Sequence, residues 1–127
     1  MTHQEYAASL REDQRCHYNC CQSTLTPFAV ECGVDAKTAC SLGAHFGAGM
    51  RRGGVCGAVT GGLMALGLMG ADEAAARGFL RRFGEEAGNL DCAQLLKHNQ
   101  ELGGDKKCHC DGLIGLAIRL VEDTARD

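Results

Sequence analysis

Apolar residues recur at helical spacing along most of this chain, and that periodicity is the feature that most constrains its fold. No segment shows the alternation of apolar and polar residues that strands require. Helix-capping residues precede the apolar patterns at Thr2, Asn19, Asp35 and Asp72, and glycines follow several of them. The sequence therefore predicts an all-α fold, a compact single-domain helical bundle over residues 1–127.

The expected helices differ in length and polarity. Their approximate ranges are 2–15, 19–33, 35–47, 54–68, 72–88 and 113–121, with a short segment at 91–97 and a polar loop at 99–107. Residues expected to face inward include Ala39, Leu42 and Phe46 in the third helix, and Phe79, Leu80 and Phe83 in the fifth.

The segment Gly54–Leu68 is predicted to be the central, buried helix. Gly53, Gly57 and Gly61 follow one another at four-residue intervals, which removes side chains from one helix face and lets another backbone come close. The uncharged run Val55–Ala71 approaches the length of a short membrane span. Its glycines and the lack of flanking aromatic residues favour a buried helix instead, so no membrane partner is expected.

Nine cysteines among 127 residues form the main chemical signal. Residues Met1–Arg15 are polar and do not resemble an apolar export signal, so we expect a reducing, cytoplasmic environment. Metal-bound or redox-cycling thiolates are favoured there over permanent disulfides. A net charge of -3 gives no basic footprint, and nucleic acid is not an expected partner.

Four cysteines stand in separate but similar contexts. Cys20 opens a predicted helix in Asn19-Cys20-Cys21-Gln22, Cys56 lies in Gly54-Val55-Cys56-Gly57-Ala58-Val59-Thr60-Gly61, Cys92 precedes Leu95-Leu96, and Cys110 precedes Leu113-Ile114. This order resembles the C_GCAxxG_C_C family, which is described as redox-active, over about Tyr18 to Val121. It is also similar to the amino-terminal part of split-Soret cytochromes.

The resemblance implies that Cys20, Cys56, Cys92 and Cys110 are the motif cysteines and the ligands of an iron–sulfur cluster. Cys108 is an alternative for the fourth place. No Cys-x-x-Cys-His motif is present, so attached c-type haem is not expected.

Five further cysteines are additional to the family pattern. Cys21 stands where a small residue is usual, and Cys32 and Cys40 are expected to be buried core residues. Cys16 would share a helix face with Cys20 if the helix were continuous, and the run Cys108-His109-Cys110 offers three donors in one loop. A local dithiol or metal site therefore stays open as an alternative.

Four thiolates from separate helices meet around soft iron or zinc only where backbones approach closely, and the glycine face provides that approach. Four cations close in sequence to Cys56 and Cys110 would offset the negative charge of such a site: Arg51, Arg52, Lys106 and Lys107.

The sequence thus predicts a small redox-active protein for electron transfer or redox sensing, with a 2Fe-2S cluster favoured. Two alternatives remain, a metal-free thiol–disulfide protein and a structural zinc protein. No catalytic role is assigned to any residue, and no hydrolase constellation is found. The expected partner is a redox protein of unknown identity, and a homodimer stays open.

Overall fold

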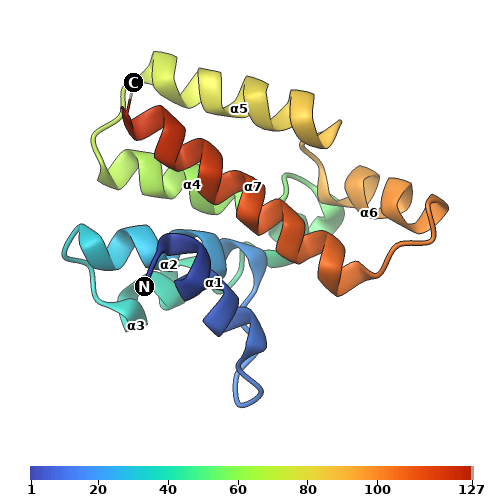
Figure 1. Ribbon diagram of the computed structural model, residues 1–127, viewed down its shortest axis with the longest axis horizontal. Coiled ribbons are helices and arrows are strands. Elements are labelled where there is room, and N and C mark those ends of the chain that lie inside the picture. The colour runs from blue at the N-terminus through green and yellow to red at the C-terminus, as the bar shows by residue number, and fades with distance from the viewer. Residues whose placement is uncertain (127) are drawn as a thin grey trace.

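The computed structural model describes residues 1–126 and contains helices but no strand within that range. In chain order the elements are α1 (His3–Glu12), α2 (Cys20–Glu31), α3 (Ala36–Gly43), the short turn η1 (Gly49–Gly53), α4 (Gly57–Leu68), α5 (Glu73–Ala87), α6 (Cys92–Glu101) and α7 (Lys106–Arg126). In Figure 1, α4, α5 and α7 form the upper layer, α1 to α3 lie below, and α6 extends to the right. The predicted all-α fold is confirmed.

All four predicted helix caps are present. The side chains of Thr2, Asn19, Asp35 and Asp72 each accept a hydrogen bond from a backbone N–H in the first turn of the following helix. Asn19 does so as part of a capping box, because the Gln22 side chain accepts a bond from the Asn19 N–H in return. Local chemistry therefore sets these helix starts.

Several predicted boundaries were wrong at the other ends. The first helix stops at Glu12 and the third at Gly43, where residues 2–15 and 35–47 were expected. The short segment at 91–97 is the start of the longer helix α6, and the polar loop at 99–107 shrinks to the few residues between α6 and α7. The helix predicted at 113–121 is the middle of α7. Tertiary packing extends these helices beyond their apolar patterns.

The glycine helix α4 packs against α2, α5 and α7, which confirms its central position. A Cβ atom on Gly61 would lie 2.7 Å from the Cys21 carbonyl oxygen, and one on Gly57 would lie 3.0 Å from Cys20 Cβ. Side chains at these two positions would therefore separate α4 from α2. Gly53, the third glycine of the series, lies before the helix and against Ala93 of α6.

The core is continuous and formed mainly by α2, α4, α5 and α7. Phe79 and Phe83 of α5 are fully buried as predicted, and Leu80 is partly buried. Leu42 is an exception, because the early end of α3 leaves its side chain 59% exposed. None of the helices within residues 1–126 combines the length and apolar character that a membrane crossing requires.

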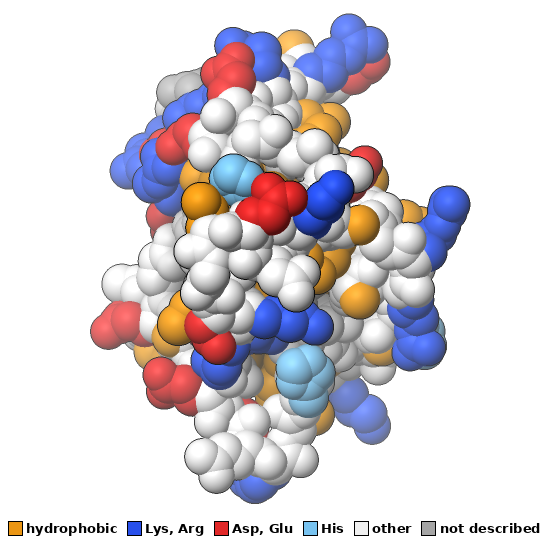
Figure 2. Space-filling view, turned by 90° about the vertical axis from the view of Figure 1, so that its right-hand side faces the viewer, with side chains coloured by type: hydrophobic (Ala, Val, Ile, Leu, Met, Phe, Trp, Pro, Cys, Tyr) orange, Lys and Arg blue, Asp and Glu red, His pale blue; other side chains and the backbone are white. Residues whose placement is uncertain are grey.

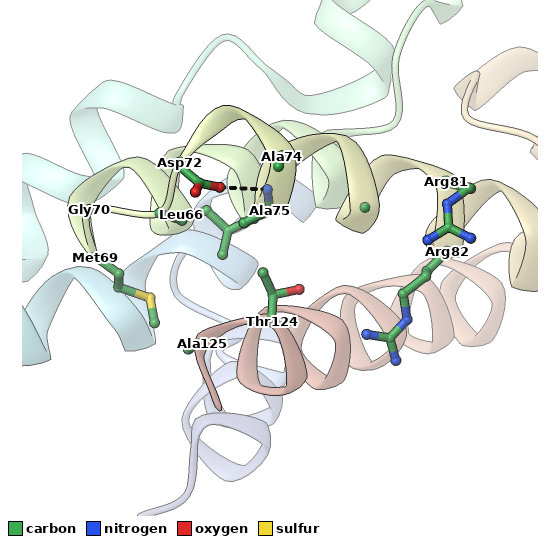
Figure 3. A pocket seen from close by; sticks show the side chains of 12 residues that line it. Leu66, Met69, Gly70, Asp72, Ala74, Ala75, Arg81, Arg82, Thr124 and Ala125 are labelled. Atoms are coloured by element: carbon green, nitrogen blue, oxygen red, sulfur yellow. Dashed lines mark hydrogen bonds between the residues drawn. The ribbon is translucent and has the colours of Figure 1, made fainter. Parts of the chain in front are cut away.

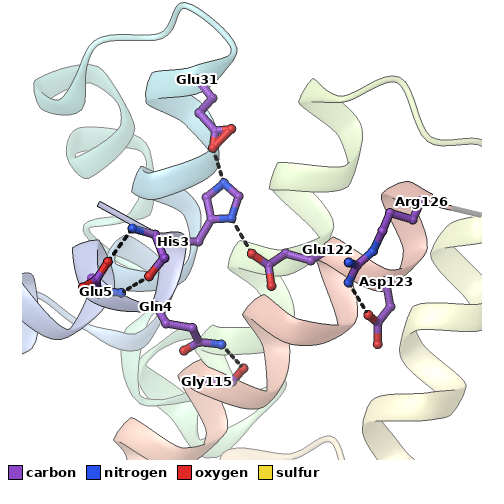
Figure 4. A network of polar contacts seen from close by, with 9 residues as sticks. His3, Gln4, Glu5, Glu31, Gly115, Glu122, Asp123 and Arg126 are labelled. Atoms are coloured by element: carbon purple, nitrogen blue, oxygen red, sulfur yellow. Dashed lines mark hydrogen bonds and ion pairs between the residues drawn. The ribbon is translucent and has the colours of Figure 1, made fainter.

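A polar network fastens α1 to the rest of the molecule (Figure 4). The His3 ring stacks on Phe28, with ring centroids 4.1 Å apart, and lies between the carboxylates of Glu31 and Glu122. It thereby links α1 to the end of α2 and to α7. This contact fixes the start of α1 at the end of α2 that lies opposite Cys20.

Candidate redox site

The four motif cysteines lie at or near the amino-terminal ends of four different helices. Cys20 and Cys92 are the first residues of α2 and α6, and Cys56 is the N-cap residue of α4. Cys110 lies within the first two turns of α7. Helix amino termini carry partial positive charge and free N–H groups, which stabilise nearby negative charge and oppose the effect of burial on these thiols.

Backbone contacts bring the helix starts together. The Cys56 N–H donates to the Leu90 carbonyl at 2.8 Å, and the Cys92 N–H donates to the Gly54 carbonyl at 2.7 Å. These bonds flank an isolated antiparallel bridge between Val55 and Asp91. The openings of α4 and α6 are thus joined directly.

Glycines allow the remaining close approaches. A Cβ on Gly57 would meet Cys20, and one on Gly49 of η1 would lie 2.8 Å from Cys92 Cβ. Larger residues at either position would push one of these cysteines away from the others.

The four thiols interact electrostatically. The Cys20 and Cys110 thiols act on each other: the interaction with Cys20 lowers the pKa of Cys110 to about 7, and the interaction with Cys110 together with burial raises the pKa of Cys20 far above its ordinary value. Burial raises the pKa of Cys56 to about 11, although N–H groups of the α4 amino terminus oppose the shift. The pKa of Cys92 is raised by burial and by the charge of Cys110. The protein therefore favours one thiolate among this group, at Cys110, unless positive charge is added.

A cavity of about 200 Å³ opens beside these thiols. Cys20, Cys92 and Cys110 line it, while Cys56 lies behind them and is only 3% exposed. No carboxylate of residues 1–126 lines the cavity. Its remaining lining residues are Arg11, His17, Asn19, Ala48, Leu96, Lys106 and Lys107.

Arg11 is the residue of this site that sequence reasoning missed. Its side chain is only 10% exposed, and its guanidinium donates to Asp111 Oδ1 at 2.7 Å and to the Tyr18 carbonyl at 2.8 Å. Its positive charge lowers the pKa of both Cys20 and Cys110. No motif marks Arg11, because it lies on a polar helix that precedes the motif region.

The predicted cations divide into two groups. Lys106 and Lys107 line the cavity, and Lys107 also pairs with Asp111 at 2.8 Å. Arg51 and Arg52 lie in η1 and do not line the cavity.

The five additional cysteines do not line this cavity. Cys16, Cys32 and Cys108 are exposed, so the prediction that Cys32 belongs to the core was wrong. Cys40 is half-buried near the Thr26 hydroxyl. Cys21 is fully buried, with its sulfur 3.9 Å from the sulfur of Met64.

The two local alternatives fare differently in the structure. The helix does not continue from Cys16 to Cys20, because α2 begins at Cys20, so these residues share no helix face. In the 108–110 run, Cys110 reaches the cavity while Cys108 is exposed. The His109 Nε2 atom is buried without a partner in the described chain, and burial lowers the pKa of its ring.

The donor chemistry fits a soft metal centre, because three thiols and no carboxylate of residues 1–126 line the cavity. Within residues 1–126, no three His, Cys, Asp or Glu side chains are arranged so that they could hold a single metal ion. The thiols are thus grouped but do not converge on one point as a closed zinc site does.

A larger cavity, about 600 Å³, lies elsewhere between α4, α5 and α7 (Figure 3). Small and apolar side chains form most of its lining. Arg81 and Arg82 stand at one end, and their charges pair with Glu85 and Asp123. No cysteine or histidine lines this cavity, so it offers no redox donor.

Comparison with known proteins agrees with the cysteine pattern. No curated protein and no solved structure matches the chain. One family model matches residues 18–124, a range that includes every motif cysteine, and its description is "Putative redox-active protein (C_GCAxxG_C_C)". The match covers most of the chain, so this cysteine-rich helical protein belongs to the C_GCAxxG_C_C family.

Proposed function

We propose that the protein is a redox protein that holds an iron–sulfur cluster, of the 2Fe-2S type, between Cys20, Cys56, Cys92 and Cys110. One observation supports the proposal most: four helices place these cysteines, far apart in sequence, within mutual electrostatic contact beside one cavity. A bound cluster would accept and release single electrons. A reducing compartment such as the cytoplasm would keep the thiols available for it.

The residues around the thiols suit an anionic centre. The guanidinium of Arg11 and the ammonium of Lys106 both favour the thiolate form of Cys110. The backbone N–H groups of Ala58 and Val59, at the start of α4, lower the pKa of the Cys56 thiol and so favour its thiolate in the same way. Together with the helix amino termini, these groups would stabilise negative charge without becoming ligands themselves.

A structural zinc ion is a weaker candidate. A closed four-cysteine zinc site needs its sulfur atoms around one centre, and the described side chains have no such arrangement. A cluster with more than one metal spans a wider set of thiols, which agrees better with grouped but separated donors.

Anaerobic purification tests the proposal. We expect a brown protein with equal amounts of iron and acid-labile sulfide, about two of each per chain for a 2Fe-2S cluster. Colourless protein with one zinc per chain would indicate a structural zinc site in place of the cluster. Protein without any metal would contradict both the cluster and the zinc site.

The contact between Cys20 and Cys110 favours a second candidate, a thiol–disulfide protein without metal. The Cys110 thiolate would attack a disulfide substrate and release one substrate thiolate. Cys20 would then lose its proton and displace the second, which leaves a Cys20–Cys110 disulfide and a substrate reduced by two electrons. Alkylation by iodoacetamide tests this candidate: metal-free protein should react first at Cys110, with a midpoint near the lowered pKa of about 7.

A further inference from the structure

Unpaired positive charge gathers at the end of the molecule that holds the cysteines. Of the 13 Lys and Arg residues, eight form ion pairs within residues 1–126. The cations without an ion-pair partner in that range are Lys37, Arg51, Arg52, Lys97 and Lys106. All except Lys37 lie on η1, on α6 or at the start of α7, the elements around the motif cysteines.

These four cations are exposed, and each lies on an element that carries or contacts a motif cysteine. Lys106 lines the cavity directly, and Lys97 is exposed on α6, the helix that begins at Cys92. Arg51 and Arg52 are exposed on η1, which packs against α6 and touches Cys92 through Gly49. We call this set, Arg51, Arg52, Lys97 and Lys106, the basic face.

The backbone of η1 is held in an unfavourable conformation that exposes these side chains. Ala48, Met50 and Arg51 have φ values of 52°, 60° and 64°, and no other non-glycine residue in the described chain has a positive φ. Left-handed backbone is unfavourable for residues other than glycine, and strain of this kind concentrates at functional sites. Met50 is 48% exposed beside Arg51 and gives the basic face an apolar contact.

Cations outnumber acidic residues among the unpaired charges on the elements near the motif cysteines, although the net charge of the chain is -3. Figure 2 shows this end of the molecule, where Lys and Arg side chains lie on both halves and Asp and Glu side chains lie mostly on the left and near the top. Asp91, Glu101 and Asp105 are the unpaired acidic residues near this end, and Asp105 accepts a hydrogen bond from the Cys108 N–H. An acidic surface would be attracted here and repelled elsewhere.

We propose that the basic face is the docking surface for an acidic electron-carrier protein that exchanges single electrons with the cysteine site. This inference rests on the proposed redox function and adds the place and the chemistry of the partner. One electron passes from the reduced carrier to the site, and no bond is formed or broken. Small, salt-sensitive interfaces with charged rims are typical of such encounters.

Binding can be tested without any bound cofactor. Metal-free, ¹⁵N-labelled protein is titrated at low ionic strength with unlabelled flavodoxin, a small acidic electron carrier. Amide shifts should be confined to residues 48–53, 92–97 and 104–107, and they should disappear in high salt. The double substitution Arg51→Gln/Arg52→Gln should weaken binding about tenfold, while Lys37→Gln, which removes the distant unpaired cation on α3, should leave it unchanged.

Electron exchange is measured separately on the loaded protein with two small probes of opposite charge. Ferricyanide accepts one electron to give ferrocyanide, and hexaammineruthenium(III) accepts one electron at a positive centre. If electrons leave through the basic face, the rate of electron transfer to the anion ferricyanide falls with rising salt, and the rate to the ruthenium cation rises. A net charge of -3 would by itself give the opposite salt dependence for each probe.

The two experiments fail for different reasons. Flavodoxin shifts that are absent, or that map to other helices, overturn the docking surface whether or not the protein holds a cluster. Binding to phosphatidylserine vesicles without binding to flavodoxin also overturns it, because the basic face would then serve a membrane. A protein without redox activity but with flavodoxin bound at the basic face would overturn the proposed function and leave the surface in place.

Discussion

The thiols of Cys20 and Cys110 shift each other's pKa although the two residues belong to the second and the last helix of the described chain. Arg11 acts on both of them from α1, where Asp111 and the Tyr18 carbonyl hold its guanidinium. The site therefore draws on both ends of the chain. Four predictions follow from this arrangement and from the packing around it.

Serine substitution of the motif cysteines should remove the cofactor. Cys20→Ser, Cys56→Ser, Cys92→Ser and Cys110→Ser should each abolish or strongly reduce iron binding, because a hydroxyl is a poor ligand for soft iron. Iron and sulfide analysis after anaerobic reconstitution measures the effect. Cys32→Ser and Cys108→Ser, both at exposed positions, are the matched controls and should keep full iron content. Normal iron binding in Cys56→Ser combined with loss in Cys108→Ser would show that the ligand set is wrong.

Alkaline pH should unfold the metal-free protein through its buried thiols. Burial raises the pKa of Cys21 to about 12 and that of Cys56 to about 11, above the ordinary value of 9.0. The folded state thus favours the neutral thiols, so their stabilising effect is complete below about pH 9 and is lost as the pH rises towards the folded-state values. At about pH 11, each of these two buried thiols should lower the free energy of unfolding by about 2 kcal/mol.

Thermal melts across this range test the effect against a variant. Cys21→Ala removes one buried thiol and should show a smaller fall in Tm between about pH 8 and pH 11 than the parent protein. Cys32→Ala should melt like the parent at every pH, because Cys32 is exposed. Identical pH profiles for all three proteins would mean that the buried thiols do not govern alkaline stability.

The contact between α4 and α2 should depend on Gly61. A Cβ at this position would lie 2.7 Å from the Cys21 carbonyl oxygen, so Gly61→Ala should lower stability by about 1–3 kcal/mol. Gly67 is in the same helix with no atom within 4 Å of the corresponding position, and Gly67→Ala should raise stability by up to about 1 kcal/mol. Chemical denaturation gives both values, and equal signs for the two variants would contradict the close packing. Gly103→Ala would not serve as a control for this comparison. Gly103 has a φ of 74°, so alanine at this position would itself be strained.

The backbone strain of η1 should be relieved by glycine. Met50→Gly removes the steric penalty of the left-handed region, while the greater freedom of glycine in the unfolded chain acts against this gain. The substitution should therefore leave stability equal or raise it by about 1 kcal/mol. Met50→Val places a β-branched residue at a φ of 60° and should lower stability by about 1–2 kcal/mol. Urea denaturation of both variants tests the conformation, and a more stable Met50→Val than Met50→Gly would contradict it.

The helix starts and the inward faces of the longer helices could be read from the sequence because they depend on neighbouring residues. The caps at Thr2, Asn19 and Asp72 are side-chain to backbone bonds over three residues, and Phe79 and Phe83 follow helical periodicity. The four motif cysteines were recognised in the same way, from short local contexts. Whether they bind a cluster is still a prediction.

Only the tertiary structure decided how the cysteines are grouped and which charges surround them. Leu42 and Cys32 fit an apolar pattern yet are exposed, because burial depends on which helix packs where and not on periodicity alone. Arg11 reaches the site because α1 packs beside α2 and α7, a long-range contact without a local signal. Sequence thus determined the helices and the thiol donors, whereas packing determined the cavity, the Cys20–Cys110 contact and the basic face.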